Sequence, residues 1–385
     1  MRILISSTYF HPYSSGLSVY AQRLAEGLGE LGHEVVVLTS QFKSDLDLLE
    51  EKEKFRIVRV PVMARVSKGV LMPSLVKVAR KWIEWADVVN LHLPQFESLL
   101  LSQAAKDLGK PVLVTYHCDL VISSGGILDN LAAKVTTEIG KQVLRDASLV
   151  VQNSLDYAEH SPVLSQLLDK VVEVPTPVKA KTVTKENLDT FRQKFGVRKE
   201  DRVVGLAGRV AAEKGYEYLA MALPAILEAY PEARVVHAGA WKSVVGEQAY
   251  QKQVERYIQP FGQKWISLGY LDDEDFEAFF AVCDVLMFSS LNATESYGIV
   301  QIEAMTQGTP VVASDLPGVR QPVLQTGLGT IVPLKDPAAI AKAVIELLDK
   351  CGNGRFIPTD FLEKFKQDAV ARHYEELLYL LVNDD

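Results

Sequence analysis

Three kinds of feature are scarce in this sequence of 385 residues, and each scarcity excludes a class of protein. Cysteine occurs three times, at Cys118, Cys283 and Cys351, without CxxC spacing or an obvious pairing. We therefore expect no disulfide framework, as in proteins of a reducing compartment. No stretch contains eighteen uninterrupted apolar residues, so no membrane-spanning helix is expected. The first residues, MRILISSTYF, lack the basic and apolar regions of an export signal, and the cytoplasm is the expected location.

Basic residues are fewer than acidic ones, 41 against 49, and the resulting formal net charge of −8 is atypical of a general nucleic-acid-binding protein. The segment from Lys52 to Trp82, which we call the basic region, is an exception. It contains nine lysines and arginines and a single acidic residue, Glu53. Such a segment suits contact with an anionic ligand or with the anionic inner face of a membrane, to which the protein would then be peripheral.

Hydrophobic residues are abundant, at 48% of the chain, and they occur in short runs. Segments with helical periodicity separate the runs, a pattern typical of parallel sheets with helices on both faces. The runs are RILISS, HEVVVLTS, RIVRVPV, DVVNLHL, PVLVTYH, ASLVVQN and KVVEVPT in the first half, and RVVGLAG, ARVVHAGA, WISLGYL, DVLMFSS, TPVVASD and GTIVPL in the second. The sequence therefore predicts an α/β protein with two Rossmann-like domains.

The boundary between these domains is predicted within VPTPVKAKTV, where Pro175 and Pro177 oppose regular structure. We place the first domain at residues 1–178 and the second at 179–369. The last helical pattern, DFLEKFKQDAVARHYEELLYLLVN, is expected to return to the first domain, so that residues 370–385 join it.

A loop, TYFHPYSSGLS, follows the first predicted strand, and a helix is expected to begin around Val19. Ligands of open α/β sheets bind beyond the carboxyl ends of strands, where loop amides and helix N-termini hold anions. Gly16 would allow the backbone to approach such a ligand closely. A turn glycine in an ordinary strand-to-helix loop is the alternative, and the residues alone leave both open.

The segment GLAGRVAAEKG places Arg209 and Lys214 after the first strand of the second domain. A guanidinium and an ammonium five positions apart can converge on one diphosphate and stabilise its departure without a metal. Loop cations are often merely solvated. Their position at the carboxyl end of a strand favours the diphosphate.

Two carboxylates, Glu295 and Glu303, lie eight positions apart in ESYGIVQIE, a stretch otherwise nearly free of charge. A helix is predicted from near Gly298 to near Gly308, with Glu295 before it and Glu303 on it. Carboxylates accept hydrogen bonds from vicinal hydroxyls, so one can hold a sugar and the other a ribose. A glutamate at a helix N-terminus can instead be a partner of the helix dipole, which would explain only Glu295.

The backbone between the two glutamates is a candidate phosphate site, because amides at a helix N-terminus point toward an anion. The residues of this site are Ser296, Tyr297, Gly298 and Ile299.

Together these motifs resemble those of the retaining nucleotide-sugar glycosyltransferases of the GT-B fold, in the group 1 or family 4-like class. The resemblance extends over nearly the whole chain, from SSTYFHPYSSG through GHEVVVLTS and GRVAAEKG to GTPVVASDLPG. It implies two Rossmann-like domains that face each other across a cleft. It also implies transfer of a hexosyl group, with retention and without a metal or cofactor. The donor would be UDP-hexose or GDP-hexose, and the acceptor a hydroxyl of a glycan or lipid-linked saccharide.

The resemblance assigns roles to four residues of the second domain. Glu295 would contact the donor sugar and Glu303 the ribose. Arg209 and Lys214 would bind the diphosphate and, with Glu295, belong to the catalytic residues.

Two further residues are implied in the first domain. His117, in VTYHCD, matches a catalytic histidine near the transferred sugar, although a histidine that ends a strand is often only structural. Gly16 matches a glycine-rich loop beside the diphosphate. The family commonly has two adjacent glycines there, whereas this chain has Ser15 before Gly16, and a serine still offers its amide and hydroxyl. This departure from the family pattern affects the part of the site that binds the acceptor.

Other functions fit less of the sequence. A sugar-nucleotide 2-epimerase shares the architecture but would need acid and base residues around the sugar and no acceptor. A glycan phosphorylase would need a lysine-bound pyridoxal phosphate, for which no convincing site is found. A non-catalytic sugar-nucleotide-binding protein would not need both cations and both glutamates.

Two charged patterns have plainer interpretations. Asp45 and Asp47 form a DxD in SDLDLLEE, which we interpret as the solvated face of an acidic helical run rather than a metal site. Within residues 70–89, an amphipathic helix that packs its apolar side on the sheet is predicted by the helical spacing of Leu75, Val78, Ala79, Trp82 and Ile83. Its cations extend the basic region, which would suit a lipid-linked acceptor.

Overall fold

The computed structural model describes residues 1–66, 69–121, 127–179, 181–242, 244, 246–350 and 355–383. The chain divides into two compact units: unit 1 is Met1–Val178 with Lys364–Asp385, and unit 2 is Lys179–Glu363. The division after Val178 lies where the two prolines led us to place it. The chain returns to unit 1 at Lys364, a few residues earlier than expected.

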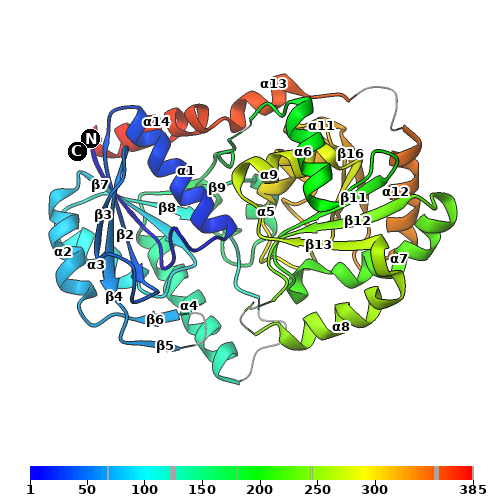
Figure 1. The fold of residues 1–385 in the computed structure, drawn as a ribbon. Helices are drawn as coiled ribbons and strands as arrows, with labels where there is room; N and C mark the ends of the chain where they lie inside the picture. The colour runs from blue at the N-terminus through cyan, green and yellow to red at the C-terminus, as the bar shows by residue number, and fades with distance from the viewer. Residues whose placement is uncertain are drawn as a thin grey trace. The chain divides into compact units, whose positions relative to one another are not determined.

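Unit 1 is built on an eight-stranded sheet with the order β10-β9-β8-β7-β1-β2-β4-β3 (Figure 1). Neighbouring strands pair in parallel except β3 and β4 at the edge, which are antiparallel. The strands are β1 (Arg2–Ser6), β2 (Glu34–Gln41), β3 (Leu49–Glu51), β4 (Arg56–Pro61), β7 (Val88–Leu93), β8 (Val112–Tyr116), β9 (Leu149–Gln152) and β10 (Val171–Glu173). A separate hairpin is formed by β5 (Ala64–Val66) and β6 (Gly69–Leu71). The strand order reverses between β1 and β7, and ligands of such sheets bind beyond the carboxyl ends at that point.

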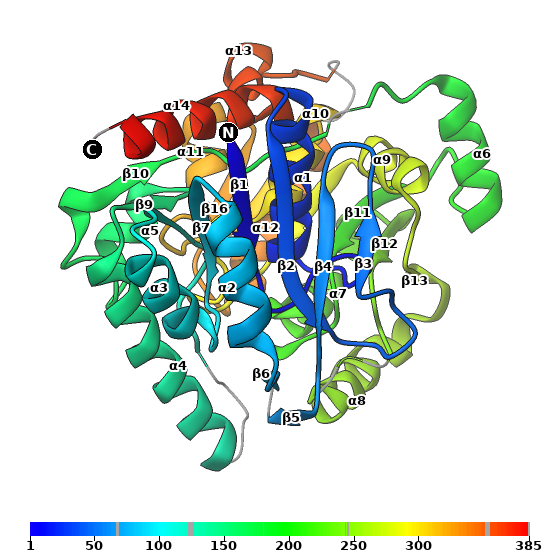
Figure 2. The ribbon, with the colours of Figure 1, turned by 90° about the vertical axis from the view of Figure 1, so that its left-hand side faces the viewer.

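Helices cover both faces of this sheet. One face carries α1 (Gly16–Glu30) and α14 (Gln367–Asn383), which pack against each other, and α14 also contacts β7 (Figures 1 and 2). The prediction that the C-terminal helix returns to the first domain is confirmed. The other helices of the unit are α2 (Leu75–Trp85), α3 (Ser98–Asp107), α4 (Ile127–Asp146) and α5 (Leu155–His160), with the 3-10 turn η1 (Leu168–Lys170). Figure 2 shows α2 and α3 in front of the strands, on the other face.

Unit 2 contains a six-stranded, fully parallel sheet with the order β13-β12-β11-β14-β15-β16. Its strands are β11 (Arg202–Ala207), β12 (Ala233–Ala238), β13 (Trp265–Gly269), β14 (Val285–Phe288), β15 (Val311–Ser314) and β16 (Gly329–Val332). In sequence order this is the 3-2-1-4-5-6 arrangement of a Rossmann sheet, which reverses between β11 and β14. The loops after these two strands are therefore the expected ligand site.

The helices of unit 2 bury their apolar sides on this sheet. Leu219 and Leu223 of one helix and Val344 of another pack with strand residues such as Val204 and Val285 in one core cluster. The helices are α6 (Lys185–Phe195), α7 (Tyr216–Ala229), α8 (Gln248–Ile258), α9 (Asp273–Val282), α10 (Ile299–Thr306), α11 (Gln321–Thr326), α12 (Pro337–Lys350) and α13 (Thr359–Leu362). The 3-10 turns are η2 (Ala212–Lys214), η3 (Gln259–Lys264) and η4 (Glu363–Phe365), the last at the boundary with unit 1.

The acidic run SDLDLLEE is not a helix, and that prediction is wrong. Its first half is turn and its end is the edge strand β3. The strand is favoured because Glu50 and Glu51 reach arginines of β4: Glu50 Oε2 lies 2.6 Å from Arg59, and Glu51 pairs with Arg56. Asp45 and Asp47 are exposed, in line with a solvated role.

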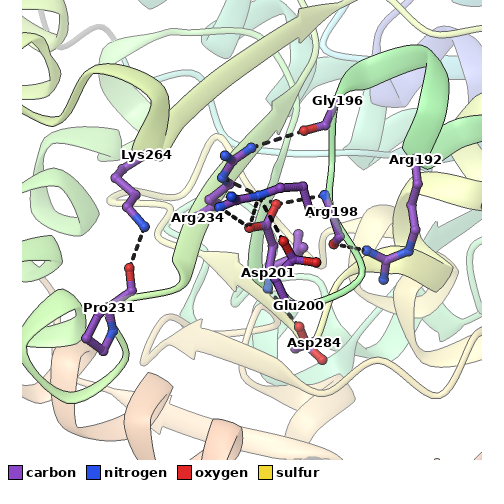
Figure 3. A network of polar contacts seen from close by, with 10 residues as sticks. Arg192, Gly196, Arg198, Glu200, Asp201, Pro231, Arg234, Lys264 and Asp284 are labelled. Carbon is purple, nitrogen blue, oxygen red and sulfur yellow. Dashed lines mark hydrogen bonds and ion pairs between the residues drawn. The ribbon is translucent and has the colours of Figure 1, made fainter.

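A network of arginines and carboxylates holds the amino end of the unit 2 sheet (Figure 3). Asp201 is 3% exposed and accepts hydrogen bonds from the backbone and guanidinium of Arg198, at 2.8–3.1 Å. The guanidinium of Arg234 lies 3.3 Å from the same carboxylate and donates to the Gly196 carbonyl at 3.0 Å. These contacts tie the loop before β11 to β12.

Candidate active site

At the opposite, carboxyl end of β11, the backbone turns sharply at Gly208. Its φ of +125° is in the region that favours glycine, and its carbonyl accepts a 2.7 Å hydrogen bond from Nε2 of His237. Burial lowers the pKa of His237 to about 4, so this ring is a neutral support. Arg209 follows and is exposed.

The loop after β11 meets the loop after β14 at Gly215. Gly215 has φ +62°, and a Cβ added there would lie 2.6 Å from the carbonyl oxygen of Ser289. Two hydrogen bonds join the loops: Ser289 Oγ donates to the Lys214 carbonyl at 2.8 Å, and Leu291 N donates to the Glu213 carbonyl at 2.8 Å. Glycine is required at this point because the two backbones almost touch.

Each predicted diphosphate-binding cation is paired with a carboxylate. Arg209 Nη2 lies 2.6 Å from Glu213 Oε1, and Lys214 Nζ lies 2.5 Å from Glu295 Oε2. Lys214 Nζ also sits 5.3 Å from the centroid of the Phe288 ring. The side chains of the Lys214–Glu295 pair are about one-fifth exposed, at 18% and 20%, so solvent and solutes reach them. The structure thus brings Lys214 to Glu295 and pairs Arg209 with Glu213, two ion pairs that the sequence does not predict.

Helix α10 begins at Ile299, after Gly298 in the left-handed region at φ +84°. A Cβ at Gly298 would lie 2.5 Å from Phe288, so only glycine fits. Ser296 and Tyr297 are buried, at 7% and 3% exposure. Within the described part of the chain, the amides of Ser296, Gly298 and Ile299 donate no hydrogen bond, which agrees with a helix N-terminus open to an anion.

Glu303 lies one turn into α10 and is 3% exposed. Its neighbour Gln301 is also buried and donates to the carbonyls of Tyr297 at 2.6 Å and Val319 at 3.0 Å. The helix start and Glu303 are therefore held in one rigid element. The ribose contact of Glu303 stays a prediction.

In unit 1, Ser15 and Gly16 form the start of α1, which begins three residues earlier than predicted. Ser15 is the N-cap: its hydroxyl accepts from Ser18 N at 3.2 Å, and its amide donates to Ser18 Oγ at 2.8 Å. The amide and hydroxyl that we expected Ser15 to offer are thus used inside the helix cap. A Cβ added at Gly16 would meet nothing within 4 Å, so the space above this residue is open.

His117 follows β8 and is 9% exposed. Its Nε2 lies 2.9 Å from Nδ1 of His92, and Tyr20 packs edge-on against its ring at 5.0 Å. Burial lowers the pKa of His117 to about 3, so the ring is neutral near neutral pH. It can act there through a hydrogen bond but not as a cation.

The basic region is less uniformly positive than its sequence indicates. Four of its cations are paired with carboxylates: Lys52, Lys54, Arg56 and Arg59. Lys68 lies outside the described residues. Helix α2 forms as predicted and exposes three cations that have no ion pair among the described residues: Lys77, Arg80 and Lys81. None of the helices that the structure describes is long and apolar enough to cross a membrane.

Comparison with known families decides the class of this site. Residues 187–355 match the family of "Glycosyl transferases group 1", and residues 15–165 match a "Glycosyl transferase 4-like domain". The chain belongs to the group 1 glycosyl transferases. Both matched segments include predicted site residues, Gly16 and His117 in the first unit and both cations and both glutamates in the second.

Relatives of this glycosyltransferase cover most of its length. It is 27% identical to phosphatidyl-myo-inositol mannosyltransferase of Mycolicibacterium smegmatis over 91% of this chain and 85% of that protein. It is 25% identical to 2-deoxystreptamine glucosyltransferase of Streptomyces kanamyceticus over 86% and 89%. Among solved structures, Anabaena HepE in complex with UDP-glucose superposes with a TM-score of 0.78 at 20% identity, over 99% of this chain and all of that one. The predicted GT-B fold is confirmed.

Sequence reasoning missed Glu213, Phe288 and His92 as parts of the site. Glu213 carried a signal, since Arg209 and Glu213 are four positions apart, the spacing of ion pairs on a helical turn. Phe288 and His92 carried none, because each reaches the site through a neighbouring strand.

Proposed function

We propose that this glycosyltransferase moves a hexosyl group from a nucleoside-diphosphate sugar, UDP-hexose or GDP-hexose, to an acceptor hydroxyl, with retention and without a metal ion. The proposal rests on two partly exposed ion pairs, Arg209–Glu213 and Lys214–Glu295. They lie at the point where the unit 2 strand order reverses. A diphosphate is the ligand that this arrangement suits, because both cations follow the end of β11 and Lys214 is paired with Glu295, just before the open start of α10.

The ion pairs indicate how the donor would bind. In the free protein, each carboxylate neutralises a cation that would otherwise lie uncompensated. An arriving diphosphate carries more negative charge than one carboxylate and accepts from both Arg209 and Lys214, so it would displace Glu213 and Glu295. Glu295 would then be released next to the sugar, where its oxygens can accept hydrogen bonds from sugar hydroxyls.

The same cations would act in the chemical step. Negative charge grows on the diphosphate as its bond to the anomeric carbon breaks, and Arg209 and Lys214 stabilise that charge more than the ground state. The sugar gains oxocarbenium character, the acceptor oxygen bonds to the anomeric carbon on the vacated face, and a donor phosphate oxygen takes the acceptor proton. Neutral His117 would supply a hydrogen bond to the sugar. Glu303 would hold the ribose.

Thermal unfolding with a panel of nucleotides tests the donor site. UDP, GDP, ADP and their hexose conjugates are added with EDTA to the wild type and to Glu303→Ala. Saturation at 100 times Kd should add about 2.7 kcal/mol to the free energy of unfolding. Stabilisation by one nucleotide, lost in Glu303→Ala, supports the donor and the ribose contact. Absence of stabilisation by any nucleotide would contradict the proposal.

Turnover separates transfer from the alternatives. Release of the nucleoside diphosphate that depends on an added acceptor, with an unchanged anomeric configuration in the product, supports retaining transfer. Formation of an epimeric sugar nucleotide without acceptor would indicate a 2-epimerase. Binding without turnover over a broad acceptor set would indicate a binding protein.

For the acceptor, we propose a hydroxyl of a saccharide or lipid-linked saccharide presented at a membrane surface. Two observations support this: one relative is named phosphatidyl-myo-inositol mannosyltransferase, and α2 exposes Lys77, Arg80 and Lys81. Each well-placed cation contributes about 1 kcal/mol to binding of anionic lipid.

Sedimentation with vesicles tests this surface. Vesicles containing phosphatidylserine should pellet the wild type, and the triple change of these cations to glutamine should abolish it. Neutral phosphatidylcholine vesicles are the control, and equal pelleting of wild type and variant would contradict the surface.

A further inference from the structure

A line of buried polar side chains crosses the face of the unit 1 sheet covered by α1 and α14. Its successive contacts are Tyr20 Oη to Tyr374 Oη at 2.9 Å, Tyr374 Oη to Thr115 Oγ1 at 3.0 Å, Thr115 Oγ1 to Asn90 Oδ1 at 3.0 Å, Asn90 Nδ2 to His92 Nε2 at 3.4 Å, and His92 Nδ1 to His117 Nε2 at 2.9 Å. All of these residues are at most 9% exposed. The line ends at the carboxyl edge of the sheet, at His117.

The sheet places these residues on one face. Asn90 and His92 are two positions apart on β7, and His92 pairs with Thr115 of β8. Val88 and Leu113, on the same face, belong to the apolar cluster that includes Tyr20 and Tyr374. The polar line is therefore enclosed between the strands and the two helices.

Asn90 determines the direction of the hydrogen bonds that lead to His117. Its Oδ1 can only accept and its Nδ2 can only donate. Because Oδ1 accepts from Thr115, Nδ2 faces Nε2 of His92, which must then be the unprotonated nitrogen. A neutral His92 carries its proton on Nδ1 and donates it to Nε2 of His117. The proton of a neutral His117 is thereby placed on Nδ1.

Both rings are neutral. Burial lowers the pKa of His117 to about 3, and burial with the neighbouring His117 lowers that of His92 well below its usual range. Among the described residues, no hydrogen bond to Nδ1 of His117 is found. A fixed N–H donor that has no acceptor in the described part of the protein is thus left at the edge of the sheet where ligands of this fold bind.

We propose that Asn90 and His92 are positioning residues that hold His117 in the Nδ1–H tautomer, so that His117 donates a hydrogen bond to an oxygen of the transferred sugar. The sugar as ligand rests on the proposed function, whereas the tautomer is a property of the protein without ligand. Three residues that touch no substrate, Asn90, His92 and Thr115, thereby fix what His117 can recognise: an acceptor atom and not a donor.

NMR of the full-length protein labelled with ¹⁵N-histidine tests the tautomer. Long-range ¹H–¹⁵N spectra near neutral pH distinguish protonated from bare ring nitrogens, and His117→Gln and His92→Gln assign the two rings. We expect bare Nε2 and protonated Nδ1 in both. A His117 ring protonated on Nε2 would overturn the proposal.

Substitution of Asn90 by aspartate tests the direction. A carboxylate can only accept, so His92 would donate from Nε2, accept at Nδ1, and leave His117 protonated on Nε2. We expect this inversion and a roughly tenfold lower kcat/KM for the donor, the worth of about one hydrogen bond. Unchanged tautomers in a folded Asn90→Asp protein would overturn the proposal.

A pair of changes at Thr115 covers the case in which Asn90→Asp does not fold. Thr115→Val keeps the shape but removes the donor to Asn90, so both orientations of the amide become populated and His117 shows mixed tautomers. Thr115→Ser keeps the donor and should show the wild-type pattern. The same spectrum for all three proteins would overturn the proposal.

The two proposals can fail separately. If the wild-type protein binds nucleotide but has His117 protonated on Nε2, only the proposed tautomer is contradicted. If it has the expected tautomer but binds no nucleotide, only the proposed donor site is contradicted.

Discussion

The amino end and the carboxyl end of the unit 2 sheet both carry arginines, lysines and carboxylates, but in different settings. At the amino end, Arg198 and Arg234 share the fully buried carboxylate of Asp201, and Arg234 also donates to the Gly196 carbonyl (Figure 3). At the carboxyl end, Arg209 and Lys214 each have one carboxylate partner, in partly exposed pairs.

The difference teaches what separates a structural charge cluster from a candidate ligand site. The number of charged residues does not separate them, because both ends carry several. What separates them is whether a carboxylate partner can be exchanged for a ligand. A partly exposed carboxylate can be replaced by a phosphate at small cost, whereas removal of a buried partner leaves an uncompensated charge.

Asp201→Ala should have the largest effect of the changes that test this comparison. Loss of the buried carboxylate leaves the guanidinium of Arg234 without its carboxylate partner and should lower the free energy of unfolding by about 3 kcal/mol. Chemical denaturation measures this. Asp189→Ala, which removes the exposed partner of Lys199, is the matched control and should cost under about 1 kcal/mol. Equal losses would erase the distinction between buried and exposed pairs.

Lys214→Ala should show the reverse pattern. Loss of this cation is expected to lower kcat by about a hundredfold, because it stabilises charge on the leaving diphosphate. The free energy of unfolding should change by less than about 1 kcal/mol, since the pair with Glu295 is partly exposed. Steady-state kinetics and denaturation are measured on the same preparation. Lys199→Ala at the amino end should leave kcat unchanged, and a variant that loses stability but not turnover would contradict the site.

Gly215→Ala compared with Gly196→Ala isolates the contact between the two loops. Both glycines have similar positive φ, +62° and +66°, but a Cβ would collide with Ser289 only at Gly215. Gly196→Ala should cost about 1 kcal/mol for the left-handed backbone alone, and Gly215→Ala at least about twice that. Thermal unfolding measures both. Equal costs would mean that the loops are free to separate.

Acid should weaken the carboxyl end through His237. Its pKa is lowered to about 4 in the folded protein, so the unfolded chain binds more protons below its ordinary pKa near 6.5. The contribution is constant above pH 6.5 and is lost as the pH falls toward 4, at up to about 1.4 kcal/mol per pH unit. In denaturation between pH 4 and 8, His237→Gln should remove that part of the slope. An unchanged slope would show that His237 is not buried as a neutral ring.

Much of the fold follows from local pattern. Every strand predicted from an apolar run is present, because residues such as those of DVLMFSS and RVVGLAG can be buried on both faces only in a parallel sheet. The errors are also local: α1 begins at Gly16 and not near Val19, because the Ser15–Ser18 capping box extends it. The run SDLDLLEE contributes to an edge strand, because arginines of β4 offer its glutamates partners.

The chain alone identifies the residue types of the candidate site and their position after strands β8, β11 and β14, since strand ends and glycines are written in local sequence. Their partners are decided only by the tertiary structure. Lys214 and Glu295 are 81 positions apart and meet because β11 and β14 are neighbours in the sheet. His92 and His117 meet because β7 and β8 are, and Tyr374 joins their line from the far end of the chain. Sequence determines which charges and rings exist, and strand order determines which of them neutralise or orient one another, because those interactions act only over a few ångströms.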